Sequence, residues 1–295
     1  MDWIELRPGI HACLRPEAGA NLGLVGGADG WLLVDTAFCA MELLGALDAK
    51  GICLSDITLT FNTHFHADHT WGNQLVHSRI LGQRRCRELM QEMLDGPWSA
   101  EARERWLAEL ATSDPAGAER YCEALADLRV TPPTETFVQH KHLTLGRRRL
   151  EFIHLGGHTP DLSVLWLPDD GVLFASDLLF MGRYPFLTHA DVPVWIRALK
   201  RLRRLEPQIV VPGHGILAGA GALDAQSHYL EETWQRCAEE RARGRDLEAL
   251  LADPGFPRLA GDPTGRRHAE NITRMCILQE NPAAAPAPLA RRASL

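Results

Sequence analysis

The sequence predicts an α/β protein in which a helical insert near residues 82–130 separates two strand-rich halves. Three observations support this class. Short apolar segments alternate with turns and one helix over residues 9–66, and strand–helix–strand order is typical of α/β architecture. Amphipathic helical periodicity then replaces this pattern up to about residue 130. Strand-like segments resume at residue 135, so the chain reads as two strand-rich halves separated by the insert.

The first half contains four expected strands and one helix. The segment "AMELLGALDAKG" has helical spacing and ends at Gly51, a residue suited to a left-handed C-cap. The segment "DITLTFNTHFH" (56–66) is rich in β-branched residues and predicts a strand that continues into a cluster of histidines. Three earlier strands are expected at 9–14, 21–27 and 30–36.

The insert contains three amphipathic segments, which predict helices at 84–96, 99–114 and 116–128. One interpretation is a helical subdomain with ordinary apolar faces. A second, compatible interpretation is a lid that shapes a substrate pocket. The exposed faces of these helices are also candidates for the interface of a homodimer.

The second half predicts strands within 135–158 and 163–177, the latter folded as a hairpin at "PDDG". A helix is expected over 191–205 with Asp191 as its N-cap, followed by a buried strand in "PQIVVPGHG". Two more helices are expected near 221–243 and 266–280. We expect a single domain over residues 1–280. The Pro/Ala-rich tail, 281–295, is expected to be disordered.

Composition restricts the class of partner. The chain has 295 residues, a net charge of -7 and a pI near 6.0, which argues against a general binder of nucleic acid or of anionic membranes. It contains neither a basic, apolar leader nor an apolar stretch of about 18 residues, so we expect a cytoplasmic location. The seven cysteines form no CxxC pair, as expected of reduced thiols.

The segment "THFHADHT" concentrates metal-binding side chains. His64, His66, Asp68 and His69 fall within six positions. Side chains two apart on a strand share a face, so His64 and His66 are expected to project together, with Asp68 and His69 following in a loop. A lone histidine in a loop is usually a solvated side chain. The density of ligands here favours a metal site.

Three further candidates follow apolar segments in the second half. His158 lies in "LGGHTPD", Asp177 in "VLFASDLLF" and His214 in "VVPGHG". Residues just past the carboxyl end of a strand are well placed to face a shared cleft. Together with the histidine cluster they make seven candidate ligands, enough for two metal ions.

These motifs resemble a known family. "HFHADH", "GGHTPD", "ASDLLF" and "PGHG" are similar to the metallo-β-lactamase superfamily in its dinuclear form, as in glyoxalase II. "LLVDT", ending near Asp35, resembles the early aspartate motif of that superfamily. "SDLLFMGRYPF", "ADVPVWIRALKRL" and "RRHAENITRM" resemble its SoxH-like hydrolases. The resemblance implies an αββα sandwich with the metals at one edge.

The resemblance also implies how the ligands are divided. Two divalent ions are implied, with zinc foremost and iron or manganese as alternatives. Asp177 would bridge the two ions, and Asp35 would order the loop that presents the ligands. The first ion would be held by His64, His66 and His158, and the second by Asp68, His69 and His214.

The implied activity is that of a hydrolase whose metal-bridging hydroxide cleaves a thioester, lactone or related ester of a small molecule. Asp68 would serve catalysis as well, by orienting the proton of the nucleophile. Tyr184 is a second catalytic candidate if it reaches the cleft, and Arg183 beside it would suit an anionic substrate group. Phe180 occupies the position at which related lactonases are described with tyrosine, which argues against a close match to those enzymes.

Two alternatives compete with this hypothesis. A persulfide dioxygenase of the same fold would use one iron, held chiefly by the residues assigned above to the first ion. A degenerate member acting as a scaffold should have lost ligands, whereas all seven are present here. His189, His228 and His268 are expected to be surface histidines, although His268 and Asn271 on the last helix would line the pocket if that helix folds back over it.

Overall fold

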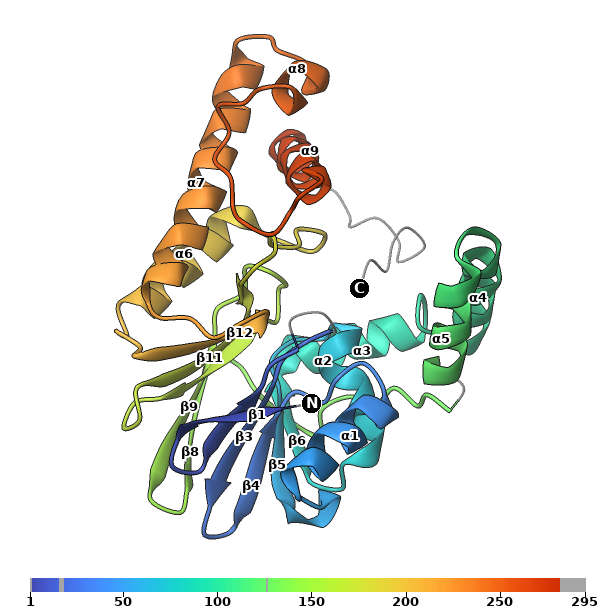
Figure 1. The fold of residues 1–295 in the computed structure, drawn as a ribbon, viewed down its shortest axis with the longest axis vertical. Helices are drawn as coiled ribbons and strands as arrows, with labels where there is room; N and C mark the ends of the chain where they lie inside the picture. Colours follow the sequence, from blue (N-terminus) through green and yellow to red (C-terminus); the bar gives the residue numbers. More distant parts are fainter. Residues whose placement is uncertain (1, 16–18, 126, 282–295) are drawn as a thin grey trace.

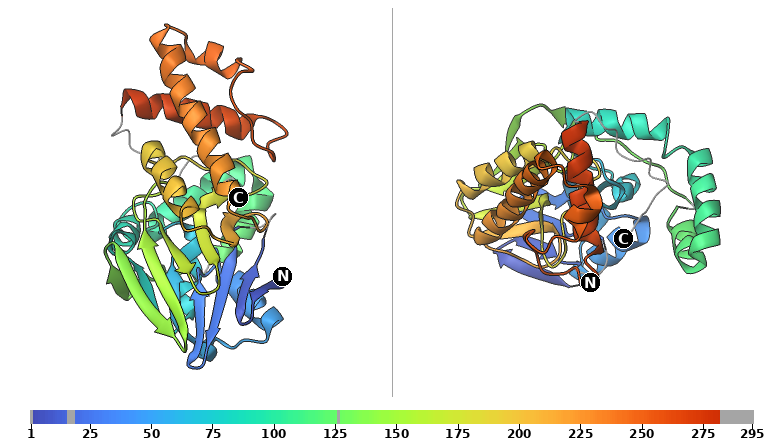
Figure 2. Two further views of the ribbon diagram at one scale, coloured as in Figure 1. Left: turned by 90° about the vertical axis from the view of Figure 1, so that its left-hand side faces the viewer. Right: turned by 90° about the horizontal axis from the view of Figure 1, so that it is seen from above.

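The computed structural model describes residues 2–15, 19–125 and 127–281, and within them two β-sheets pack face to face with helices on their outer sides (Figures 1 and 2). The first sheet has seven strands whose order across the sheet follows the chain. The second has five strands in the order β12-β11-β10-β9-β8. The strands are β1 (Trp3–Arg7), β2 (Ile10–Cys13), β3 (Leu22–Gly27), β4 (Gly30–Val34), β5 (Ile57–Asn62), β6 (Arg79–Gln83), β7 (Glu135–Phe137), β8 (His140–Leu145), β9 (Arg148–His154), β10 (Ser163–Leu167), β11 (Val172–Phe180) and β12 (Ile209–His214).

Strand direction determines where the chain can place functional groups. Strands β4 to β7 run parallel to one another, as do β11 and β12, while the remaining neighbours are antiparallel. Parallel strands deliver their carboxyl ends to the same edge of a sheet. The segments that follow β4 and β5 therefore emerge at one edge of the first sheet, and those that follow β11 and β12 emerge at one edge of the second.

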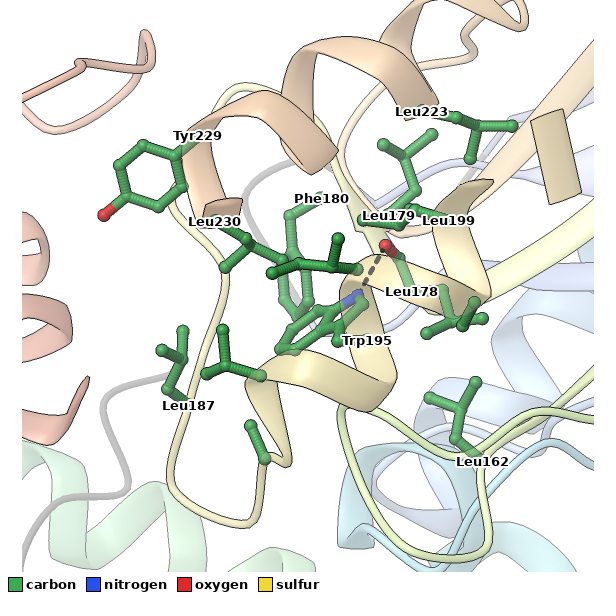
Figure 3. Close-up of a cluster of buried hydrophobic side chains, with 14 of the residues drawn as sticks. Leu162, Leu178, Leu179, Phe180, Leu187, Trp195, Leu199, Leu223, Tyr229 and Leu230 are labelled. Carbon is green, nitrogen blue, oxygen red and sulfur yellow. Dashed lines mark hydrogen bonds between the residues drawn. The ribbon is translucent and has the colours of Figure 1, made fainter. Parts of the chain in front are cut away.

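Helices cover both sheets. Helix α1 (Ala40–Lys50) packs on the first sheet, while α6 (Val192–Arg203) and α7 (Gly221–Ala242) pack on the second. The first core layer lies between α1 and the first sheet, the second lies between the two sheets, and the third lies under α6 and α7. Figure 3 shows part of the third layer, where Trp195 on α6 donates a hydrogen bond to the Leu178 carbonyl at 3.0 Å. The expected α/β class and αββα layering are confirmed.

The insert forms three helices, as predicted: α3 (Arg84–Leu94), α4 (Ala100–Ser113) and α5 (Pro115–Leu125). Helices α4 and α5 stand beside the sandwich instead of covering a sheet (Figure 1). Trp98 and Tyr121 belong to a buried cluster with Phe65 and Trp71. Because Phe65 lies between two of the candidate ligands, this cluster places the insert next to the histidine segment.

Local signals in the sequence are confirmed at several points. Gly51 caps α1 in the left-handed conformation, with φ of 71°. The Asp191 side chain accepts a hydrogen bond from the Val194 N–H at the start of α6, and "PDDG" joins β10 to β11 as an antiparallel hairpin. The last predicted helix is α9 (Arg266–Glu280).

Other features were missed or lie outside the described residues. The edge strand β1, the strand β6 and the five-residue helix α8 (Leu247–Leu251) were not predicted. A four-residue helix, α2 (Ala67–Thr70), occupies a position where a loop was expected. The tail predicted to be disordered comprises residues 281–295, and all of it except Asn281 lies outside the described residues. In the part of the chain that the structure describes, no helix is long and apolar enough to span a membrane.

Candidate metal centre

All seven candidate ligands meet at one edge of the sandwich. They form two groups, and within each group the potential ligand atoms lie within 4.8 Å of one another. The first group is His64, His66, His158 and Asp177, and the second is Asp68, His69 and His214. The five histidines and Asp68 divide as the family resemblance implied, whereas Asp177, the implied bridge, falls in the first group. Metal binding by these residues stays a prediction.

The local structure of the histidine segment differs from the prediction. Strand β5 ends at Asn62, so His64 and His66 lie in a loop and not on a pleated strand. The chain leaves the sheet at Thr63, whose N–H and hydroxyl both donate to the Asp35 carboxylate at 2.9 Å. The His64 and His66 rings nevertheless lie 4.7 Å apart, centroid to centroid. Their proximity therefore does not come from strand periodicity.

Asp177 faces both groups. Its Oδ2 lies 3.2 Å from His158 Nε2 in the first group, and its Oδ1 lies 3.2 Å from His69 Nε2 in the second. It was expected after a strand but lies within β11, where the pairing with β12 is irregular on both sides of Ser176. Ser176 has a left-handed φ of 48°. Such strain in a non-glycine residue turns the next side chain and is typical of functional sites.

Gly213 makes room for the Asp177 carboxylate. A Cβ atom at position 213 would lie 1.8 Å from Asp177 Oδ1 and 2.7 Å from the Asp177 main-chain nitrogen. Only glycine fits this close approach of two neighbouring strands. The glycine of the "PGHG" motif therefore has a packing role at the centre, in addition to the ligand role expected of His214.

Each of the five histidines uses one ring nitrogen in a hydrogen bond directed away from the centre. Such bonds fix the tautomer and leave the other nitrogen able to accept a metal ion. The five pairs are His64 Nδ1 with Thr63 Oγ1 (3.1 Å), His66 Nε2 with His189 Nδ1 (2.9 Å), His69 Nδ1 with Asp35 Oδ2 (2.7 Å), His158 Nδ1 with the Phe186 carbonyl (3.0 Å), and His214 Nδ1 with the Gly19 carbonyl (3.2 Å).

The donor set fits a metal ion. His64 Nε2, His69 Nε2 and Asp177 Oδ1 are buried atoms with no hydrogen-bond partner in the described part of the chain. Orphaned buried polar atoms are rare unless an ion or a water occupies the space between them. Imidazole nitrogen and carboxylate oxygen are ligands of zinc, iron and manganese. These observations support metal binding.

The protonation states follow from burial and from the carboxylates around His69, which are Asp177, Asp68 and Asp35. Burial lowers the pKa of His64 and His66 well below the usual range and that of His158 to about 4, so these rings are neutral and able to bind metal. Burial also disfavours charge on His69, but Asp177 and Asp68 outweigh it and hold the pKa of His69 well above its usual range. A metal ion would therefore displace a proton from this ring.

The remaining candidates, Arg183 and Tyr184, lie in the loop that joins β11 to α6. Tyr184 is buried, and its hydroxyl accepts a hydrogen bond from the Leu259 N–H at 2.7 Å. Its ring packs against Tyr229 and His268. A catalytic role for Tyr184 stays a prediction. Arg183, the candidate for binding an anionic group, is half-buried.

The three histidines expected at the surface have different environments. His228 is exposed, as expected. The prediction is wrong for His268, which is 2% exposed because α9 folds back and brings it to the Tyr229 hydroxyl. His189 is half-buried and contacts His66. No sequence pattern marks His189, because a single histidine in "LTHAD" resembles any loop histidine.

Comparisons with known proteins find relatives of this chain in sequence and in structure. The model of the metallo-beta-lactamase superfamily matches residues 15–214. A linear primary-alkylsulfatase from a Pseudomonas species is 26% identical over 211 residues, which are 63% of this chain and 40% of that protein. A type 2 metallo-beta-lactamase from Bacteroides fragilis is 29% identical over 111 residues, 34% of this chain and 45% of the relative.

Solved structures show the same fold. The sec-alkylsulfatase Pisa1 from Pseudomonas sp. aligns with a TM-score of 0.71 at 16% identity, over 96% of this chain and 51% of its own. A metallo-beta-lactamase from Pontibacter korlensis aligns with a TM-score of 0.58 at 20% identity, over 78% of this chain and 98% of its own. This chain spans less than half the length of the curated relatives described above.

Proposed function

The chain belongs to the metallo-β-lactamase superfamily, and on that premise we propose that it is a hydrolase that uses two divalent metal ions, zinc foremost, to cleave an ester bond of a small molecule. The observation that carries this proposal is the Asp177 carboxylate, whose two oxygens each lie 3.2 Å from a histidine of a different ligand group. A shared carboxylate of this kind suits two ions better than one.

A dinuclear centre, when bound, supplies an activated water and a Lewis acid for the bond to be cleaved. The residues of this chain hold and orient the reactants. His64, His69 and His158 are fully buried, whereas Asp68 and His66 are half-buried. Substrate would therefore approach from the side of Asp68 and His66. Asp68 directs Oδ2 toward His214, and its carboxylate can accept the proton of the attacking water.

Two classes of ester are candidates. The glyoxalase II-like and SoxH-like motifs favour a thioester, lactone or related carboxylic ester. A sulfate ester is the second candidate, because an alkylsulfatase is among the relatives in sequence and another is among those in structure, where it aligns along 96% of this chain. The dioxygenase alternative would need a single iron in the first group.

The proposal extends to location and partners. We place the protein in the cytoplasm, with a small molecule as its substrate and with no nucleic acid or membrane as a partner. The helical insert is the proposed lid, and its exposed faces are the proposed interface of a homodimer. The net charge of -7 supports the exclusion of nucleic acid.

The first experiment is elemental analysis of protein purified without chelator or added metal, combined with turnover assays. The assays cover thioesters, lactones and alkyl sulfates, and oxygen uptake with a persulfide. We expect about two metal ions per chain, hydrolysis of one ester class and no oxygen uptake. One iron per chain with oxygen uptake would replace the hydrolase with the dioxygenase.

A pair of variants connects activity to the centre. His66→Ala removes a ligand of the first group and should abolish hydrolysis while the protein stays folded. His228→Ala, a matched change at an exposed histidine on α7, should leave hydrolysis intact. Normal turnover by His66→Ala would contradict the dinuclear assignment.

A further inference from the structure

We propose that His189 is a positioning residue of the metal centre, which holds the His66 ring in the tautomer and orientation that metal binding requires. The inference rests on the proposed metal centre and goes beyond it, because neither the family motifs nor the ligand pattern includes His189. The residue lies in the loop between β11 and α6, between Thr188 and Ala190.

The geometry defines what each nitrogen of His66 does. His66 Nδ1 lies 3.1 Å from His158 Nε2, and the opposite nitrogen of His158 is bound to the Phe186 carbonyl. Those two nitrogens therefore point into the same space. His66 Nε2 points outward to His189 Nδ1 at 2.9 Å. If Nε2 carries the proton and donates it to His189, Nδ1 keeps the lone pair that a metal ion needs.

His66 differs from the other four histidines in the kind of partner it has. His69 is held by a carboxylate, His64 by a hydroxyl, and His158 and His214 by main-chain carbonyls. A main-chain carbonyl is present whichever residue occupies the position. The imidazole acceptor of His66, in contrast, is lost when one side chain is replaced. His66 is also the half-buried histidine of the set, so competing water can reach it more easily than the others.

The loop that carries His189 is itself held in place. Arg274 on α9 donates to the Thr188 carbonyl at 2.9 Å, and Asn271 donates to the Pro185 carbonyl at 3.0 Å. The His189 ring also packs against Phe65 in a T-shaped contact at 5.2 Å. These contacts give His189 one position relative to His66. Through the contacts of Arg274 and Asn271, α9 anchors this loop, and it supplies no candidate metal ligand.

A purely packing role for His189 predicts different behaviour from variants. Phenylalanine would keep a ring against Phe65 but would lose the acceptor. Asparagine would lose the ring but would place an amide oxygen near the position of Nδ1. If the hydrogen-bond acceptor matters, His189→Asn should bind zinc more tightly than His189→Phe. If only packing matters, His189→Phe should bind zinc more tightly.

The test is a titration of metal-free protein with zinc in the presence of a competing chelator. Wild-type protein should bind two ions. His189→Phe should bind one ion as wild type does and the other about 10- to 100-fold more weakly, the usual effect of losing an outer partner of a ligand. His189→Asn should recover most of the affinity, and His228→Asn, the exposed control, should match wild type. His189→Ala provides a second acceptor-free variant if the Phe variant fails to fold.

Activity at different metal concentrations separates positioning from direct contact with substrate. Excess zinc should restore the turnover of His189→Phe if the residue acts only through His66, whereas a residue that touches substrate would not be rescued. Wild-type affinity for both ions in His189→Phe, or no rescue by zinc, would overturn the inference and leave the proposed hydrolase standing. Failure of wild-type protein to bind any metal would overturn the proposed function itself.

Discussion

The Asp35 carboxylate lies 2.7 Å from His69 Nδ1 and also accepts two hydrogen bonds from Thr63. Asp35 itself has a left-handed φ of 59°, which is uncommon for a residue with a side chain. One residue in the left-handed conformation just after β4 therefore contacts both the residue that follows β5 and the ring of His69. The ligand loop depends on a side chain that, by this geometry, is not itself a ligand.

The first prediction concerns this link. Asp35→Asn keeps the shape of the side chain but removes the charge that supports His69. We expect the ion of the second group to bind about 10- to 100-fold more weakly, because the outer partner of a ligand orients it and raises its basicity. Competitive zinc titration measures the change. Asp29→Asn, at an exposed turn, is the control, and equal affinity in the two variants would refute the link.

The second prediction concerns the close approach of two strands. Gly213→Ala would drive a methyl group into the Asp177 carboxylate and backbone. We expect a loss of about 1–3 kcal/mol in the free energy of unfolding, together with a loss of bound metal. Denaturant unfolding and elemental analysis measure the two effects. Gly219→Ala is the matched control, since a Cβ atom there meets nothing within 4 Å.

The third prediction concerns removal of metal. A bound ion stabilises the folded state by about 2.7 kcal/mol when its free concentration is about 100 times Kd. Chelation should therefore lower Tm, and added zinc should restore it. Because Asp177 and Asp68 hold the pKa of His69 above its usual range despite burial, uptake of metal should release protons and weaken as pH falls. Calorimetry in buffers of different ionisation enthalpy measures this release, and a Tm insensitive to chelator would count against metal binding.

The fourth prediction concerns Asp161, a fully buried carboxyl in the "GGHTPD" motif. Burial raises its pKa to about 6. The folded state therefore favours the neutral carboxyl, and ionisation of Asp161 lowers the free energy of unfolding. This loss of stability is absent well below pH ~4 and grows as pH rises. It is complete above pH ~6, where it amounts to about 3 kcal/mol. Asp161→Asn should stabilise the metal-free protein at pH 8 by more than at pH 5. Denaturant unfolding of both proteins at the two pH values checks this, and an equal gain at both would contradict it.

Much of the site could be predicted because it depends on local patterns. The spacing of His64, His66, Asp68 and His69 confines four ligands to one short segment, so any fold of that segment keeps them near one another. Glycines beside His158 and His214 mark turns at the ends of apolar strands, and such turns meet at one edge of an α/β sheet. The class of fold follows from the order of helices and strands, which is likewise a local property.

The rest depends on contacts between residues far apart in the chain. The end of β5 at Asn62 was not visible in its β-branched sequence. The main-chain N–H of Thr63, the next residue, donates to the Asp35 carboxylate, 28 positions away, and not to a neighbouring strand. The burial of His268 arises from the return of α9, whose Arg274 also donates to the Thr188 carbonyl beside His189. The contact of His189 with His66 joins residues 123 positions apart. The candidate metal ligands can thus be recognised from short motifs in the sequence. Their orientation, in contrast, is set by partners that only folding brings within hydrogen-bonding distance.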